Sequence, residues 1–414
     1  MLNSISTPKI RSLFPFRILL VFLGLLCIAQ LQISYAGNLD DLHNLVGDQD
    51  AVLVTDTKGR VLFSKNAGRQ LIPASTLKIL TALVALDSLG PDFRFVTEFY
   101  LDQADNLIVK GYGDPLLISE VLVQITATLA TQLSANSKEI KDLVLDDSYF
   151  GDPIVIPGVT SSYEPYDAPN GALCVNFNTV NFKRKPSGAY VSAEPQTPLL
   201  PFALDRIRAS GMKHGRIILS SEANESTRYA GHLLRHFLKQ QGIDIKGRIR
   251  IGRVRKEADK LIFKYASEFS IQQVVSKLFE YSNNFMANQL LVAIGAHVYG
   301  PPGTLPKGVR AASTFAKNVL KINNFKIVEG SGISRENKIS AHNLHIILEA
   351  FAPHYHLMRR EGRTFHKTGT LNNISTRAGY IESSKGGLYR FVVLINTPGK
   401  TTDRIMDILL NNLK

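Results

Sequence analysis

The segment Leu71-Ile-Pro-Ala-Ser-Thr-Leu-Lys78 leads into an apolar run that ends near Gly90. Pro73 suits the opening turn of a helix and Gly90 suits its end, so the segment predicts one helix between them. Its apolar positions leave almost no polar face; they are Leu77, Ile79, Leu80, Leu83, Val84 and Leu86. Such a helix is buried on most sides. We therefore expect Ser75 at the amino end of a buried helix.

Lys78 follows Ser75 by three residues, so the two side chains share one face of the predicted helix. The helix dipole favours developing negative charge at this end. An alternative interpretation makes Ser75 a simple helix cap and sends the Lys78 ammonium out to solvent. Lysine is rarely buried in proteins unless it has a partner, so its position inside this apolar helix favours a functional pair of Ser75 and Lys78.

Two further motifs follow in order, Ser282-Asn-Asn284 and Lys367-Thr-Gly369. Ser-x-x-Lys and Ser-x-Asn each occur elsewhere in the chain, so either one alone carries little weight, whereas Lys-Thr-Gly occurs once. The ordered set of three is typical of active-site-serine enzymes that act on peptidoglycan or β-lactams. It predicts acyl transfer through an acyl-serine.

Local patterns place the two later motifs. Ser282 follows a predicted helix at 271–281 and precedes another at about 285–297. Ser and Asn are also common at helix ends for capping alone, which is the alternative interpretation of this motif. Lys367 begins a predicted strand, and two more strands and a final helix at 402–413 follow it.

Between the first and second motifs the chain changes character. From 97 to 263, short strand-like runs predominate, separated by Gly, Pro, Asp and Asn turns and interrupted by a helix near 228–241. We predict an α+β fold with an antiparallel sheet flanked by helices. Its catalytic domain comprises 37–96 and 264–414, and 97–263 is an inserted, mostly β accessory domain.

The amino-terminal region has the pattern of a secretory signal peptide. Three basic residues precede an apolar run from Ile18 to Ala29, and Ser34-Tyr-Ala36 forms a small-x-small cleavage site. The run is shorter than the roughly 20 residues that a membrane-spanning helix needs, so an uncleaved anchor is the minor alternative. We predict a signal peptide at 1–36 and no stable membrane anchor after cleavage. The mature chain would keep only Cys174 and so no internal disulfide, which suits a periplasmic or secreted, wall-associated protein of a bacterial envelope.

The chain carries a formal net charge of +13. No basic run with interleaved aromatic residues is present, and export argues against a nucleic-acid partner. An anionic wall polymer is a better explanation of the charge. A solvated basic surface without a partner is the alternative.

Three further stretches resemble the serine D-alanyl-D-alanine carboxypeptidases of the low-molecular-mass class C penicillin-binding proteins. They are Gly111-Tyr-Gly-Asp-Pro-Leu116, Pro165-Tyr-Asp-Ala-Pro-Asn-Gly-Ala-Leu-Cys-Val-Asn-Phe-Asn178 and Gly330-Ser-Gly-Ile-Ser-Arg335. The resemblance implies the penicillin-recognising serine hydrolase fold. Asn288 stands where Glu is frequent in this family and Glu329 where Asp is usual, and we interpret both as structural changes. The insert is short for the family, so we expect one of its accessory domains to be reduced.

The resemblance and the chemistry assign the same catalytic roles. Ser75 attacks the carbonyl between two D-alanines, and Lys78, desolvated and close to Lys367, accepts the proton as a neutral amine. Ser282 relays that proton to the leaving amine. Asn284 holds the peptide amide of the substrate.

The Lys-Thr-Gly strand is assigned to substrate binding. Lys367 supplies a fixed positive charge, and the hydroxyls of Thr368 and Thr370, on either side of Gly369, bind the terminal carboxylate. By family analogy, the backbone amides of Ser75 and Thr370 form the oxyanion hole.

The sequence thus predicts a serine D-alanyl-D-alanine carboxypeptidase that acts on peptidoglycan stem peptides and is acylated by β-lactam antibiotics. Cleavage of D-alanyl cross-links is a second activity that the sequence leaves open. Asp146 is a candidate for binding an amine of the stem peptide, with a plain turn residue as the alternative. We expect no metal and no cofactor.

Three other functions fit the sequence less well. A β-lactamase would share the fold and motifs but needs a dedicated deacylating group, and no convincing Glu-x-x-x-Asn element follows the insert. A metal hydrolase is suggested only by the histidine-rich region 342–356, which lacks His-Glu-x-x-His. A wall-binding protein without activity would be expected to lose Ser75, Lys78 or Lys367, and all three are present.

Overall fold

The computed structural model describes residues 39–135, 139–151, 153–160, 162–220 and 222–414. The predicted signal peptide, residues 1–36, lies outside the described residues. Within the described part of the chain, no helix combines the length and the apolar character needed to cross a membrane.

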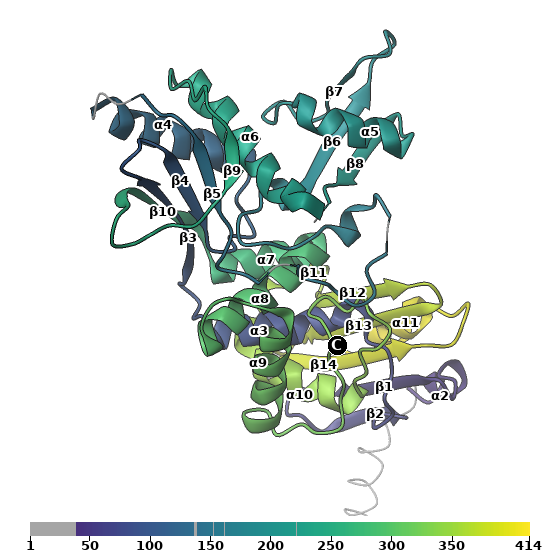
Figure 1. Ribbon diagram of the computed structural model, residues 1–414. Helices are drawn as coiled ribbons and strands as arrows, with labels where there is room; N and C mark the ends of the chain where they lie inside the picture. Colours follow the sequence, from purple (N-terminus) through teal and green to yellow (C-terminus); the bar gives the residue numbers. More distant parts are fainter. Residues whose placement is uncertain (1–38, 136–138, 152, 161, 221) are drawn as a thin grey trace, which may run out of the picture.

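A six-stranded antiparallel sheet forms the lower part of the molecule in Figure 1, in the order β11-β12-β13-β14-β1-β2. Its strands are β1 (Asp50–Thr55), β2 (Val61–Lys65), β11 (Arg359–Glu361), β12 (Thr364–Leu371), β13 (Ile374–Glu382) and β14 (Leu388–Ile395). Early and late parts of the chain meet in it, because β1 pairs with β14. Side chains of β1 alternate between two hydrophobic cores, with Ala51 in one and Val52 in the other.

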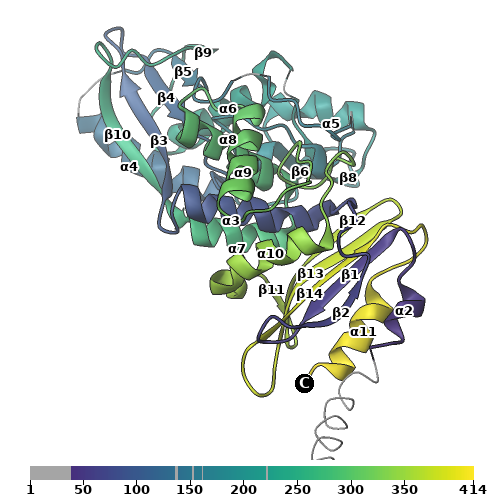
Figure 2. The ribbon, with the colours of Figure 1, turned by 90° about the horizontal axis from the view of Figure 1, so that it is seen from below.

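Helices cover both faces of this sheet (Figure 2). One face carries α3 (Lys78–Ser88), α7 (Ile271–Tyr281), α8 (Asn284–Tyr299), α9 (Leu305–Asn318) and α10 (Ala341–Phe351), and the other carries α2 (Leu42–Leu45) and α11 (Asp403–Asn412). Helix α3 packs against α7, α8, α9 and α10. Every α3 residue from Lys78 to Leu86 is buried, which confirms the predicted helix without a polar face.

The α-helix begins later than the sequence suggests. Ala74–Leu77 form a 3-10 turn, η1, and α3 starts at the next residue. Ala74 has a φ of 47°, which strains a residue that carries a Cβ. The sheet holds this turn in place, because Thr376 Oγ1 of β13 donates to the Pro73 carbonyl at 2.7 Å. Ser75 is therefore fixed on a tight turn packed against the sheet.

The insert forms the upper part of the molecule in Figure 1. Its larger sheet has the order β10-β3-β4-β5-β9, formed by β3 (Arg94–Leu101), β4 (Leu107–Gly111), β5 (Leu143–Asp146), β9 (Ile249–Ile251) and β10 (Lys260–Ser270). A smaller sheet has the order β7-β6-β8, formed by β6 (Thr179–Arg184), β7 (Tyr190–Ser192) and β8 (His214–Ile218). The chain enters and leaves the insert side by side, since β3 and β10 are paired antiparallel. The predicted boundaries at residues 97 and 263 fall within these two strands.

Helices make up more of the insert than the sequence suggests. It contains α4 (Ser119–Ala135), α5 (Leu204–Ser210) and α6 (Glu225–Gln240), of which only α6 was predicted. Helix α4 is rich in Val, Ile and Thr, which favour strands. Its buried Val121, Ile125 and Leu129 nevertheless recur at helical spacing. Burial against the insert's own core overrides the strand propensity, so the expectation of a mostly β insert is incomplete.

Candidate active site

Segments far apart in the sequence meet at the amino end of α3. Lys78 Nζ lies 2.9 Å from Ser75 Oγ. It also lies 2.8 Å from Asn284 Oδ1, at the start of α8, and 2.8 Å from the backbone oxygen of Ser331. The Lys78 side chain thus joins the first and second motifs.

The surroundings of Lys78 disfavour its charged form. The residue is 0% exposed, and desolvation lowers its pKa well below the usual lysine value. The positive charge of Lys367 lowers this pKa further, while the carboxylate of Glu329 acts in the opposite direction. A neutral amine in contact with Ser75 Oγ is the arrangement that an activated serine nucleophile requires.

Glu329 organises the loop that presents the Ser331 carbonyl to Lys78. Its buried carboxylate accepts hydrogen bonds from the Ser331 backbone N–H at 2.6 Å and from the Asn337 side-chain amide at 2.6 Å. Asn288 of α8 donates to the same carboxylate at 3.2 Å and accepts from the Gly330 N–H at 2.7 Å. Asn288 and Glu329, the two departures from the family pattern, are therefore hydrogen-bonded to each other. Together they position the loop whose Ser331 carbonyl contacts Lys78. The sequence marked both residues as departures from the family pattern but gave no sign that they contact each other.

The Lys-Thr-Gly motif lies on β12, directly against η1. Lys367 is 3% exposed, and its burial lowers its pKa to about 8. A Cβ on Gly369 would lie 2.7 Å from the backbone nitrogen of Ser75, so only glycine permits this approach. Thr368 and Thr370, on either side, are exposed. The structure therefore brings the third motif to the same turn as Ser75.

Ser282 lies in the connection between α7 and α8. Its φ of 51° is left-handed, which permits the abrupt change of direction between the two helices. The capping interpretation applies to its neighbour Asn283, whose Oδ1 accepts from the Met286 N–H at 2.9 Å. Asn284, in contrast, contacts Lys78. The proton-relay role of Ser282 stays a prediction.

Asp146 lies apart from this group, at the end of β5 in the insert. Its Oδ2 accepts from Lys110 Nζ at 2.7 Å and from the Val254 N–H at 2.8 Å. Its Oδ1 accepts from the side chain and the backbone N–H of Ser148. The residue is 0% exposed, and each carboxylate oxygen already has two donors. This geometry favours a structural role and lends no support to an amine-binding one.

The histidine-rich region has structural contacts. His345 is buried and lies 2.9 Å from Thr55 Oγ1 of β1. Across the described ranges, no group of three or more His, Cys, Asp or Glu side chains is arranged to hold a metal ion.

A serine contacted by a buried lysine, flanked by a Ser-x-Asn turn and a Lys-Thr-Gly strand, defines the class of serine acyl-transferring hydrolases in which lysine activates the nucleophile. The chain belongs to the D-Ala-D-Ala carboxypeptidase 3 (S13) family, whose model matches residues 31–216 and 188–359. It is thus a serine-type D-alanyl-D-alanine carboxypeptidase.

Two relatives agree with this membership, and a solved structure has a similar fold. A D-alanyl-D-alanine carboxypeptidase from an Actinomadura species is 26% identical, over 83% of this chain and 77% of the relative. The D-alanyl-D-alanine carboxypeptidase DacB of Haemophilus influenzae is 24% identical, over 82% of this chain and 83% of the relative. The crystal structure of penicillin binding protein 4 (dacB) from Haemophilus influenzae has a TM-score of 0.69 at 20% identity, covering 88% of this chain and 94% of that chain. This likeness confirms the predicted fold.

Proposed function

We propose that this enzyme removes the terminal D-alanine of peptidoglycan stem peptides through an acyl-Ser75 intermediate. The observation that carries the proposal is the 2.9 Å contact between Lys78 Nζ and Ser75 Oγ, made by a fully buried lysine of lowered pKa. Ser75 itself is partly exposed, so a substrate can reach its hydroxyl.

The residues around Ser75 support a two-step reaction. The Ser75 hydroxyl proton passes to Lys78 Nζ while the oxygen attacks the carbonyl carbon of the penultimate D-alanine. The C–N bond breaks, and the terminal D-alanine leaves as an amine after receiving the proton through Ser282. Water then gives a proton to Lys78 and attacks the ester, which releases the shortened peptide and restores the Ser75 hydroxyl.

The β12 strand supports specificity for a free carboxyl terminus. The Lys367 ammonium would attract the substrate carboxylate, and the exposed hydroxyls of Thr368 and Thr370 can donate to it. The close approach of Gly369 to the Ser75 nitrogen supports an oxyanion hole made by the amides of Ser75 and Thr370. Each such donor contributes about 3 kcal/mol to the stability of the transition state.

The proposed reaction also predicts acylation by β-lactams, and its substrate indicates where the enzyme acts. A β-lactam presents a reactive carbonyl and a carboxylate, so we propose that it acylates Ser75 and that the adduct is slow to hydrolyse. A peptidoglycan substrate implies that the enzyme acts in the cell envelope or is secreted to the wall. Cleavage of cross-links needs a leaving amine from a second stem peptide, and this activity stays a prediction from the sequence.

Intact-protein mass spectrometry after incubation with benzylpenicillin tests the nucleophile. The wild-type protein should gain the mass of one penicilloyl group, and Ser75→Ala should gain none. Release of D-alanine from a soluble pentapeptide should fall by about 10⁴-fold or more in the same variant. Ser88→Ala, at the other end of α3, is the matched control and should behave as wild type. Covalent labelling of Ser75→Ala would refute the assignment.

A further inference from the structure

A pocket of about 410 Å³ lies between the insert and α7, beside the connection that carries Ser282. Tyr281 and Asn283, the two neighbours of Ser282, form its rim on the catalytic side. Its volume lies within the range of small-molecule sites, about 300–1,000 Å³. None of the catalytic roles described above uses this space.

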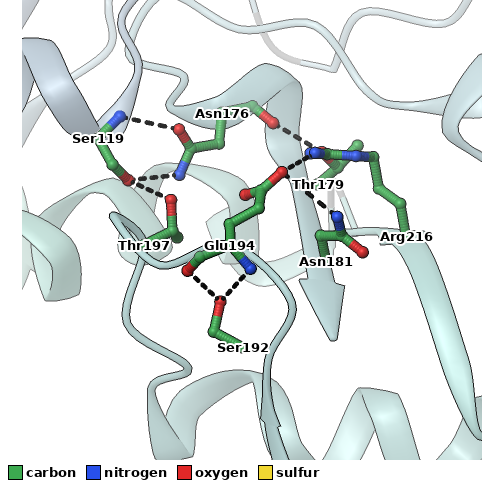
Figure 3. Close-up of polar contacts among 8 residues, drawn as sticks. All are labelled: Ser119, Asn176, Thr179, Asn181, Ser192, Glu194, Thr197 and Arg216. Atoms are coloured by element: carbon green, nitrogen blue, oxygen red, sulfur yellow. Dashed lines mark hydrogen bonds and ion pairs between the residues drawn. The ribbon is translucent and has the colours of Figure 1, made fainter. Parts of the chain in front are cut away.

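The wall that the insert contributes is fixed by a network of polar side chains (Figure 3). Arg216 donates to Glu194 Oε1 and, at 2.8 Å, to Thr179 Oγ1. Asn181 donates to the same Glu194 oxygen at 3.4 Å. The second oxygen, Glu194 Oε2, has no hydrogen-bond partner among the described residues. A carboxylate held in this way is a preformed hydrogen-bond acceptor.

The lining residues Asn176 and Phe177 belong to a stretch of strained backbone. Asn176, Phe177 and Asn178 have successive φ values of 52°, 59° and 54°. Phe177 is the outlier, because a bulky side chain rarely adopts this conformation. Asn176 holds the turn by two bonds of 2.9 Å to Ser119, at the start of α4 (Figure 3). Strain of this kind persists only where the surroundings enforce it, and it clusters at ligand sites.

The chemistry of the lining narrows the ligand class. Two acidic and two basic side chains, Glu120, Glu194, Arg216 and Lys277, cancel in formal charge. The lining also contains the apolar groups of Leu116, Ile118, Phe177 and Phe269. A lining without net charge does not select a charged peptide group. It suits a neutral ligand that carries several hydroxyl and amide groups and one apolar face, which describes an N-acetylated sugar ring.

We propose that this pocket binds the N-acetylhexosamine unit that carries the stem peptide, so that the enzyme recognises glycan as well as peptide. The proposal rests on the proposed function. An extended peptide of about four residues spans up to roughly 14 Å. Asn284, which contacts Lys78, is followed back along the chain by Asn283 in the pocket lining, so the catalytic group and the pocket are adjacent in the chain. Asn283 uses its Oδ1 to cap α8, and its Nδ2 faces no partner among the described residues. The rim therefore offers an amide donor where the glycan would arrive.

Calorimetric titration of the full-length enzyme tests the pocket directly. The probe is the peptide-free disaccharide N-acetylglucosaminyl-N-acetylmuramic acid with its lactyl carboxyl converted to the methylamide, so that the ligand is neutral as it is in the peptide-bearing substrate. Wild type should bind it, and Glu194→Gln and Lys277→Met should each weaken binding about tenfold, through loss of one charge-assisted contact. Asp205→Asn changes an exposed acid of α5 outside the pocket and should bind as wild type. Lys277→Met keeps the test informative if Glu194→Gln fails to fold. Absence of binding, or equal binding by all variants, overturns the proposal.

Kinetics separate this proposal from the proposed function. The ratio of kcat/KM for a disaccharide-pentapeptide to that for the free pentapeptide should be about tenfold or more in wild type and should fall toward one in Lys277→Met. A wild-type ratio of one would overturn the glycan site while leaving the carboxypeptidase intact. Inactivity toward both substrates would refute the proposed function. In that case the calorimetric titration with the disaccharide would still show whether the pocket binds glycan.

Discussion

Lys78 of the catalytic core is fully buried and Lys110 of the insert is largely buried, with 13% of its side chain exposed, and these two lysines have different partners. Among the described residues, the hydrogen-bond partners of Lys78 Nζ in the core are all neutral oxygens, from Ser75, Asn284 and the Ser331 carbonyl. Lys110 in the insert donates to the carboxylate of Asp146 at 2.7 Å.

The difference shows how one residue type acquires two functions. Burial works against the ionised form of Asp146, but hydrogen bonds from Lys110 and Ser148 hold its pKa below the usual value. That pair is therefore a stable ion pair inside a sheet. No carboxylate in the described part of the chain contacts Lys78, so burial lowers the pKa of this lysine and leaves a neutral amine available as a base.

Separate replacement of the two lysines should give the largest difference in acylation rate, because only Lys78 acts as a base. Lys78→Met removes the base, so acylation by a fluorescent penicillin should slow by about 10³-fold or more, while the apolar methionine keeps the helix packed. Lys110→Met should leave the acylation rate of the folded protein unchanged. Stopped-flow fluorescence measures both rates. A Lys78→Met rate within tenfold of wild type would contradict the role of Lys78 as base.

The free energy of unfolding should depend on Lys110, which the acylation rate does not. Lys110→Met leaves the buried Asp146 carboxylate without its cation and should lower the free energy of unfolding by about 3 kcal/mol. The double variant Lys110→Met/Asp146→Leu removes both charges and should recover most of that loss. Guanidinium denaturation followed by circular dichroism gives the three values. If the double variant is no more stable than the single one, the ion-pair explanation fails.

The tight packing around Ser75 can be probed from the strand. Gly369→Ala would place a Cβ 2.7 Å from the Ser75 nitrogen, which must displace η1 or β12. We expect acylation to slow about 10²-fold through loss of an oxyanion-hole donor. Gly68→Ala is the matched control, because its added Cβ meets nothing within 4 Å. Equal acylation rates in the two variants would show that this approach is unimportant.

The pKa of Lys367 predicts the smallest effect, a pH dependence. Its ammonium is present below a pKa of about 8 and lost above it, so kcat/KM for a D-Ala-D-Ala substrate should fall about tenfold by pH 9. A substrate with an amidated terminus should lack this decline. The contribution of Lys367 to stability has the opposite sign. The unfolded chain binds the proton more tightly between about 8 and 10.5, so the free energy of unfolding should rise with pH there.

Local patterns predicted much of the core. The apolar helix after Ser75, the helices around Ser282 and the strands after Lys367 all follow from side-chain periodicity. Helix α4 did not, because its β-branched residues favour a strand until packing against the insert's core decides otherwise. The partnership of Glu329 with Asn288 was also invisible, since the two meet only when α8 packs beside the glycine-rich loop.

The sequence alone determined the order of the three motifs, the buried helix that carries Lys78 and, through its family resemblance, the reaction class. Tertiary structure decided which groups surround each ionisable side chain. In the insert, the parallel register of β4 and β5 places Lys110 opposite Asp146. In the core, α3, α8 and the Ser331 loop enclose Lys78, and none of the described carboxylates contacts it. Desolvation and nearby charge set a pKa, and both depend on contacts between residues distant in the chain.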